Sequence, residues 1–202
     1  MQNLGEIIKA IFEARYLKRI KRSGTYLILG EEIEESVAEH SFYTSLWALV
    51  MHYLNPSLDL AKLLTMCLIH DLEEVRTGDL NQINRLYFTE DREVQAFSDM
   101  WADTQLGNKL IAIHQERHKD SSPEARAARD CDTLAELVLE KEYQAKGSKE
   151  AEEWIEFTLK RLKTKEGKLI ANEIQKHRLA EWWEKIKNDI RKHHKIEPVP
   201  YD

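Results

Sequence analysis

The stretch Leu68-Ile69-His70-Asp71-Leu72-Glu73-Glu74 places one histidine and three carboxylates at the end of an apolar run that begins at residue 65. These polar groups stand where a helical core should continue. A buried carboxylate without a partner is costly, and imidazole beside carboxylate is a ligand combination that holds divalent cations. A His-Asp pair alone is weak evidence, because a hydrogen-bonded structural histidine is the commoner explanation. The stretch is therefore compatible with a metal site but does not establish one.

Few turn-forming residues surround this stretch. The chain has 202 residues, of which 42% are hydrophobic and 33% charged, with only 7 Gly and 4 Pro. This length can bury one sizeable core but is short for two, and the scarcity of Gly and Pro favours long helices over a many-turned sheet. We expect an all-α fold in a single domain over residues 1–202. Its motifs would lie within about 17–143, with C-terminal helices over 148–192 packing on them and a tail over 193–202.

Charge and cysteine content limit the partners and the compartment. The net charge of −6 gives no electrostatic reason to expect a nucleic acid polymer or an anionic membrane as partner. The two cysteines lie in apolar helical contexts, which fits a reduced thiol better than a disulfide. The N-terminus lacks a secretory pattern, and no stretch reaches the ~18 apolar residues that span a bilayer. We expect a cytoplasmic protein.

Apolar periodicity and helix start and stop signals place helices along the chain. Ser36 is a predicted N-cap with Glu39 at the third helical position, a capping box. His40 follows in the first turn, where a lone histidine is more often a packed residue than a ligand. Residues 75–84 read as a loop beside the candidate site. The predicted helices cover residues 4–20, 37–54, 58–70, about 90–101, 106–118 and the segment from 125 onward, followed by two amphipathic helices separated near 164–167.

Two surface features allow more than one interpretation. Four basic residues, including Arg19 and Arg22, fall within the five positions 18–22. They could interact with the negative end of the first helix dipole, or one or two of the arginines could bind a phosphate. In the last third, the pair Trp182-Trp183 fits either the core or a homodimer contact.

Four residues in apolar helical settings supply two imidazoles and two carboxylates: His40, the pair His70-Asp71, and Asp132. Their order resembles the HD superfamily of metal-dependent phosphohydrolases, whose signature is a histidine, a His-Asp dipeptide and a distant aspartate. Three segments are similar to the branch that contains the 5'-deoxynucleotidases of the YfbR type and related small HD proteins. They are Ser36-Val37-Ala38-Glu39-His40-Ser41, His70 to Asp79, and Ser122-Pro123-Glu124-Ala125 followed by Asp130-Cys131-Asp132.

The resemblance implies one divalent cation held by His40, His70, Asp71 and Asp132. Mn, Co, Mg, Fe, Ni or Zn all suit this ligand set. Such a cation would polarise the phosphorus and lower the pKa of a bound water. The resemblance also implies an HD-type helical bundle.

Further residues follow as candidates for catalysis and substrate binding. Glu74 comes four residues after His70, so a continuing helix would place it on the same face as a general base or acid, whereas Glu73 suits a surface position. The resemblance implies that Asp79 contacts the nucleophilic water or the sugar. It also implies that Arg22 contacts the phosphate, with Arg19 as the alternative.

The implied function is dephosphorylation of (deoxy)nucleoside 5'-monophosphates to nucleoside and phosphate. Two alternatives are a dNTP triphosphohydrolase and a sensor module that binds nucleotides without hydrolysis. The branch commonly reads Arg-Thr-Gly-Trp where this chain has Arg22-Ser23-Gly24-Thr25, which leaves the preference for deoxyribose open, with Tyr26 as a candidate substitute. Thr133 replaces a lysine that often follows the distal aspartate.

A histidine pair offers a rival metal site. His114 and His118 are four residues apart on a predicted helix, a spacing that can bind a metal. Some HD proteins use extra histidines between the two aspartate motifs for a second ion. In the branch that this chain resembles, the corresponding segment binds no metal, so the resemblance favours a single ion and leaves the role of this pair open.

Overall fold

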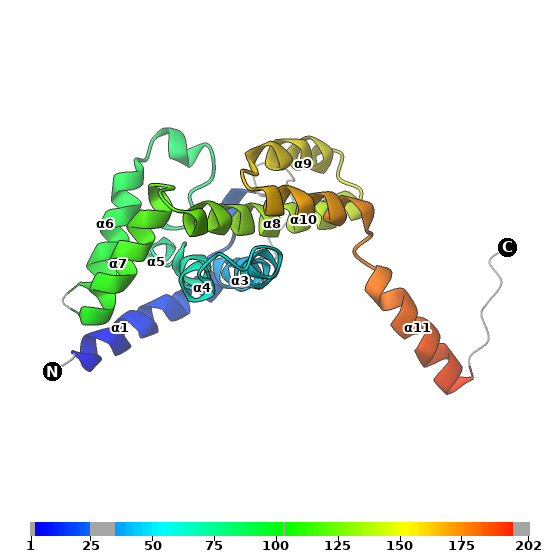
Figure 1. Cartoon of the computed structure of the whole chain (residues 1–202), viewed down its shortest axis with the longest axis horizontal. Helices are drawn as coiled ribbons and strands as arrows, with labels where there is room; N and C mark the ends of the chain where they lie inside the picture. The colour runs from blue at the N-terminus through cyan, green and yellow to red at the C-terminus, as the bar shows by residue number, and fades with distance from the viewer. Residues whose placement is uncertain (1–2, 25–34, 103, 196–202) are drawn as a thin grey trace.

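The computed structural model describes residues 3–24, 35–102 and 104–195, and within these ranges it contains helices and no strand (Figure 1). The all-α prediction is confirmed. The helices are α1 (Leu4–Ala14), the 3₁₀ helix η1 (Arg15–Arg19), α3 (Val37–Leu54), α4 (Leu60–Ile69), α5 (Glu74–Thr77), the 3₁₀ helix η2 (Asn84–Leu86), α6 (Glu90–Trp101), α7 (Gln105–His118), α8 (Pro123–Ala145), α9 (Glu150–Arg161), α10 (Lys165–Lys176) and α11 (Glu181–His194).

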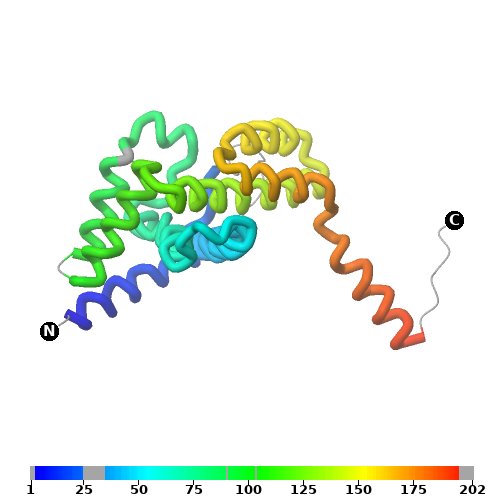
Figure 2. Tube along the Cα trace, viewed as in Figure 1, coloured from blue at the N-terminus to red at the C-terminus, as the bar shows by residue number. Residues whose placement is uncertain are grey.

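Helix α8 is the centre of the packing. It contacts α3, α4 and α7, and on another side α9 and α10, which fold back along it (Figure 2). The larger core cluster lies between these helices and includes Leu63, Met66, Leu134 and Leu137, all fully buried. A smaller cluster around Phe97 joins α6 to α1 and α7. A residue on the inner face of α8 is therefore held by helices from both halves of the chain.

The predicted capping box is present and fixes the start of α3. The Ser36 hydroxyl accepts a hydrogen bond from the backbone N–H of Glu39 at 3.3 Å, and the Glu39 carboxylate accepts from the Ser36 N–H at 2.8 Å. These bonds satisfy donors that a helix start leaves without partners. His40, in the first turn, is thereby placed on a well-anchored helix end.

Asp130 ties α8 to the start of α10. Its carboxylate accepts hydrogen bonds from the backbone N–H groups of Lys163 and Thr164 and from the Thr164 hydroxyl, at 2.6 to 2.9 Å. Gly167 packs against the same carboxylate, where a Cβ atom would collide with it. The first aspartate of the Asp130-Cys131-Asp132 segment is therefore structural.

Two predicted helices differ from the observed ones. The first, expected over 4–20, is α-helical only to Ala14 and continues as 3₁₀ turns. The C-terminal third contains three helices where two were expected, because α10 and α11 are separate. His177 is extended, and the Glu181 carboxylate accepts a hydrogen bond from the Arg178 N–H at 3.0 Å. This break uses a side-chain contact rather than Gly or Pro, so the sequence pattern does not mark it.

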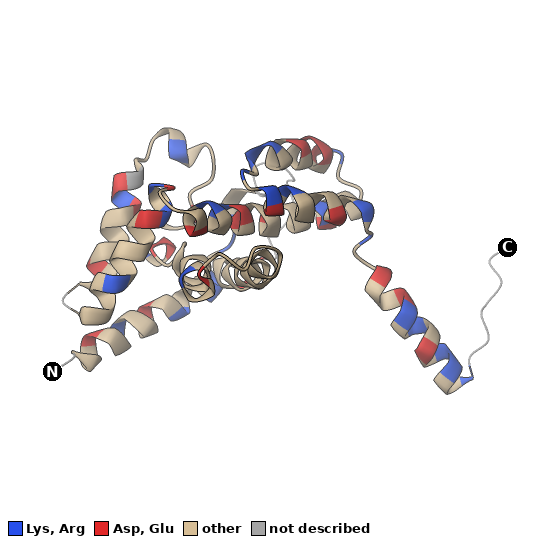
Figure 3. Cartoon of the chain, viewed as in Figure 1, with Lys and Arg blue, Asp and Glu red and all other residues tan. Residues whose placement is uncertain are grey.

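Helix α11 extends away from the body of the protein (Figure 1) and has no buried residue. Trp182 and Trp183 are 68% and 43% exposed, so neither belongs to the core. Acidic and basic side chains are interspersed along α9, α10 and α11 (Figure 3). None of the helices in the described ranges combines the length and the apolar character that a membrane span requires.

Candidate metal centre

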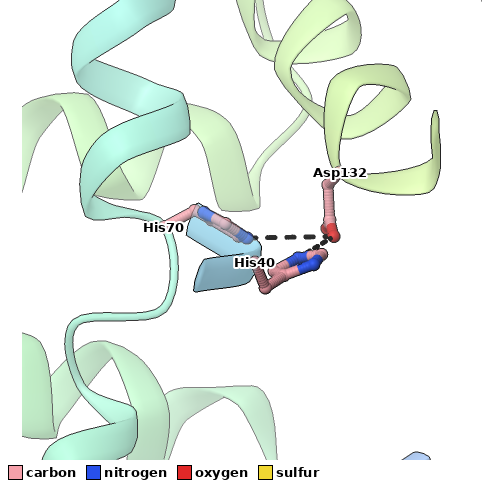
Figure 4. Close-up of side chains that lie close together, drawn as sticks. All are labelled: His40, His70 and Asp132. Atoms are coloured by element: carbon pink, nitrogen blue, oxygen red, sulfur yellow. Dashed lines mark hydrogen bonds and ion pairs between the residues drawn. The ribbon is translucent and has the colours of Figure 1, made fainter. Parts of the chain in front are cut away.

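Three helices bring His40, His70 and Asp132 to one point (Figure 4). His40 comes from the first turn of α3, His70 caps the C-terminus of α4, and Asp132 lies on α8. One ligand atom from each residue lies within 4.8 Å of the others. His40 Nε2 is 3.0 Å from Asp132 Oδ1, and His70 Nε2 is 3.8 Å from the same oxygen. Both imidazoles are fully buried.

The orientation of His70 is set by its other ring nitrogen. Nδ1 lies 2.8 Å from the Cys67 carbonyl oxygen, and because a carbonyl only accepts, Nδ1 must carry a proton. In the neutral ring, Nε2 then has a lone pair, which faces Asp71 Oδ2 at 3.0 Å and has no hydrogen-bond partner. A lone pair turned toward carboxylates is repelled by them unless a proton or a metal cation lies between. The donor set therefore fits a divalent cation.

The pKa of His70 supports this interpretation. Burial alone would lower it, but the Asp71 carboxylate outweighs burial and the pKa is raised. Asp132 shows the opposite shift: burial opposes its ionisation, but the hydrogen bond with His40 and the charges of His70 and Arg117 hold its pKa well below the usual range. The surroundings thus favour positive charge at His70 and negative charge at Asp132, whereas burial and the charge of Arg22 lower the pKa of His40.

Two arginines orient the carboxylates. Arg117 Nη2 donates to Asp132 Oδ2 at 2.8 Å, which leaves Oδ1 turned toward the histidines. Arg22 Nη1 lies 3.3 Å from Asp71 Oδ2 and 3.4 Å from Asp79 Oδ1. Burial lowers the pKa of Arg22, but the carboxylates of Asp79 and Asp71 raise it overall. Arg117 was not among the residues predicted from the sequence.

Asp79 and the basic segment meet through backbone contacts. The Asp79 carboxylate accepts a hydrogen bond from the Ser23 N–H, and the Ser23 hydroxyl donates to the Asp79 carbonyl at 2.6 Å. These two hydrogen bonds of Ser23 hold its neighbour Arg22 beside the metal centre. Arg19 is exposed on η1 with its guanidinium 5.5 Å from the centre of the Tyr16 ring, and it is not among the residues that line the neighbouring cavity. Tyr26 lies outside the described residues.

Glu74 reaches the site by a different route from the predicted one. Helix α4 ends at Ile69, residues 70–73 form turns, and Glu74 begins the short helix α5. The premise of one continuous helix was therefore wrong. Glu74 is nevertheless buried beside the cavity, and no described residue forms a hydrogen bond with its Oε2. Burial and the charges of Asp71 and Asp79 raise its pKa well above the usual value.

Glu73 was predicted to lie on the surface, and this prediction was wrong. Only 3% of the residue is exposed, and its Oε2 lies 3.2 Å from His114 Nε2 on α7. The turns after Ile69 rotate Glu73 inward, away from the position that a continuous helix would give it. Its position on the same short turn as Asp71 places it close to the metal centre.

A cavity of about 410 Å³ opens beside these residues. Arg22, Asp71, Glu74 and Asp79 line it, as does Asp132. Its wall also includes residues of α8 and α9 that no motif indicated, namely Glu136, Glu140, Trp154 and Arg161. The volume lies within the range of small-molecule sites.

Comparison with known proteins decides the family. Residues 14–175 match the family model described as HD domain. The chain belongs to the HD domain family. The resemblance of this chain to the HD family, which the motifs indicated, is thereby confirmed. Its HD domain is similar to the 5'-deoxynucleotidase HDDC2 of Danio rerio, with 26% identity over 71% of each chain.

Two solved structures have a similar fold. A conserved hypothetical protein from Pyrococcus furiosus is 27% identical with a TM-score of 0.71, covering 84% of this HD protein and 99% of that chain. A predicted metal-dependent phosphohydrolase from Magnetospirillum magnetotacticum is 22% identical with a TM-score of 0.68, covering 87% and 92% of the two chains. The second likeness shows the fold alone.

Glu140 makes one wall of the HD-domain cavity sensitive to pH. Burial raises its pKa from the ordinary 4.5 to about 8, even though the Thr158 hydroxyl donates to its Oε1 at 2.7 Å. Between pH 4.5 and about pH 8, Glu140 is protonated in the folded protein but ionised in the unfolded chain. The free energy of unfolding therefore falls as the pH rises through this window. We expect Glu140→Gln to be increasingly more stable than the wild type from pH 4.5 to 8.

Thermal unfolding of both proteins across this pH range measures the effect. The difference in Tm should grow with pH and level off above pH 8, since all other titrating groups are shared. Equal Tm differences at pH 4.5 and pH 8 would show that Glu140 is not protonated in the folded state.

Proposed function

We propose that this HD-domain protein removes the phosphate from nucleoside 5'-monophosphates, with deoxynucleotides preferred. The observation that carries the proposal is the cluster of His40, His70, Asp71 and Asp132 beside a cavity. All of these except His40 line the cavity, together with Arg22. The name of the Danio rerio relative, a 5'-deoxynucleotidase, supports the substrate class.

One divalent cation would be held at this site by four ligands, His40, His70, Asp71 and Asp132. When bound, the cation would supply Lewis-acid activation of the phosphoryl group and a water of lowered pKa. Mn, Co, Mg, Fe, Ni and Zn all remain compatible with two imidazoles and two carboxylates. Arg117 keeps Asp132 in the orientation that this set requires.

Other residues at the cavity would bind the substrate and transfer protons. Arg22 would bind a phosphate oxygen, because its guanidinium is planar, charged and part of the cavity wall. Glu74 would exchange a proton with the attacking water or the leaving oxygen, since its carboxyl is buried at the cavity with one oxygen unpartnered. Asp79 would orient the water or the sugar. Arg19, as placed on η1, would need to move to contribute.

Two further properties are part of the proposal. We assign the whole chain to one HD domain, since α9 and α10 pack on α8. We also propose a homodimer, since α11 exposes Trp182 and Trp183 and also Ile186 and Ile190. Light scattering on the purified protein would measure its mass in solution, and a monomer at all accessible concentrations would contradict the dimer.

A substrate screen tests the function directly. Metal-free protein is supplied with Mn²⁺, Co²⁺ or Mg²⁺ and incubated with ribo- and deoxyribonucleoside mono- and triphosphates, and the products are separated. We expect inorganic phosphate and nucleoside from the monophosphates only when metal is present. Release of triphosphate from a dNTP would indicate the triphosphohydrolase instead. Tight nucleotide binding without turnover of any substrate would indicate a sensor.

A further inference from the structure

A second group of ligand atoms lies outside the centre described above. One atom each from Glu73, His114 and His118 lies within 4.8 Å of the others. Glu73 comes from the turns after α4, and the two histidines from the last turns of α7. This group shares no residue with the cluster of His40, His70 and Asp132.

The second group is buried and incompletely hydrogen-bonded. Glu73 and His114 are 3% and 1% exposed, and His118 is half-buried. Nδ1 of His114 and Nε2 of His118 are buried, and neither has a hydrogen-bond partner among the described residues. The Phe97 ring stacks on His114 with centroids 3.9 Å apart and an interplanar angle of 9°, which fixes the imidazole in place. Buried polar atoms normally have partners, so the unpartnered nitrogens need an explanation.

A hydrogen bond between Glu73 and His114 explains only part of this arrangement. Their atoms are 3.2 Å apart, and a protonated carboxyl could donate to the ring. That bond leaves the His118 Nε2 without a partner, although the rings of His114 and His118 are 4.5 Å apart between centroids. A cation bound by all three residues would explain why a ligand atom of His118 lies within 4.8 Å of those of Glu73 and His114.

We propose that Glu73, His114 and His118 form a second divalent-metal site of the nitrogen-rich kind that suits Zn²⁺ or Co²⁺. Two imidazoles and one carboxylate are a three-residue set that leaves a coordination position open. Glu73 and His118 both line the cavity that Asp71 and Asp132 also line, so a cation held by them would be reached from that cavity. The site is therefore accessible to water and to a small anionic ligand.

The charges around the site are compatible with a cation. Burial lowers the pKa of both histidines to about 3, which leaves their nitrogens free of a second proton. The positive charges that act on His118 are those of Arg117, Arg129 and Arg85. Each of these arginines is paired with a carboxylate, of Asp132, Asp120 and Glu93 respectively. Glu73 supplies a negative charge once the cation replaces its proton.

Metal stoichiometry tests the proposal without reference to activity. Metal-free protein is saturated with Co²⁺ or Zn²⁺, desalted, and its metal content is measured by mass spectrometry. The background carries His193→Ala and His194→Ala, because this exposed pair could hold an adventitious ion. We expect two ions per chain in this background. His70→Ala and Glu73→Gln should each leave one ion, and the double variant should leave none.

Glu73→Gln is the deciding variant, because it keeps the size of the side chain and a hydrogen-bonding partner for His114. His118→Ala should also leave one ion, and circular dichroism checks that it folds. The exposed His177→Ala serves as the matched control and should keep both ions. One ion per chain in the background protein, or two ions retained in Glu73→Gln, would overturn the proposal. Anomalous scattering from Co²⁺ crystals should show a peak between Glu73 and His118, and its absence in crystals saturated with the metal would also overturn it.

Discussion

Replacing His70 by alanine is expected to lower kcat/KM for phosphate release by at least about a thousandfold. Substituting a residue that merely supports a metal ligand typically costs about 10- to 100-fold in affinity or activity, so loss of a ligand should exceed that. His70 Nε2 lies 3.0 Å from Asp71 Oδ2 and 3.8 Å from Asp132 Oδ1, so alanine removes a nitrogen from the centre of the ligand cluster. Steady-state kinetics with excess metal, together with metal content, measure the effect.

His52→Ala is the matched control for this variant. As in His70, the Nδ1 of His52 donates to a backbone carbonyl, here that of Leu58 at 3.0 Å. His52 lies at the other end of α3 from His40. It therefore reports the cost of losing such a bond without losing a ligand. If the two variants lost activity equally, or if His70→Ala kept wild-type activity, His70 would not be a ligand of the catalytic metal.

Replacing Glu74 by glutamine should lower kcat about 10²- to 10⁴-fold, the range that general acid–base catalysis contributes. Glutamine keeps the shape of the side chain but cannot exchange a proton. Because Glu74 is not one of the proposed ligands, metal content and KM should stay close to those of the wild type. The split between kcat and KM separates this role from metal binding, and a rise in KM alone would assign Glu74 to substrate binding.

Glu156→Gln on α9 is the corresponding control, since this glutamate is exposed and outside the cavity. Its kinetics should match those of the wild type. Loss of metal from Glu74→Gln would contradict the proton-transfer role and place Glu74 among the ligands.

Local signals in the sequence were sufficient to predict much of the fold. Ser36 with Glu39 marks the start of α3, and the helix begins there. The helix expected from residue 125 begins two residues earlier, at Pro123, with Ser122 as its N-cap. Because capping bonds join residues two or three apart, they can be read from a short segment. The positions of His40 and Asp132 follow from these helix starts.

The rest of the site depends on contacts between distant parts of the chain. Arg22 reaches Asp71 and Asp79 across 49 and 57 residues, and periodicity contains no information about such pairs. Glu73 was misplaced because helix α4 ends at Ile69 with no Gly or Pro to announce it. In both cases tertiary packing, rather than local preference, determines where the side chain points.

The contacts of the Asp130 carboxylate determine when, during synthesis of the chain, the metal centre becomes stable. The proposed ligands of the first centre have all been synthesised by residue 132, but Asp130, two positions earlier on the same helix, acquires its three donors only when Lys163 and Thr164 arrive. Until then the carboxylate of Asp130, a residue that is 1% exposed in the complete fold, lacks the donors that tie α8 to the start of α10. On the ribosome, where synthesis proceeds from the N-terminus, the nascent chain would therefore hold the ligands early and gain a stable metal centre late.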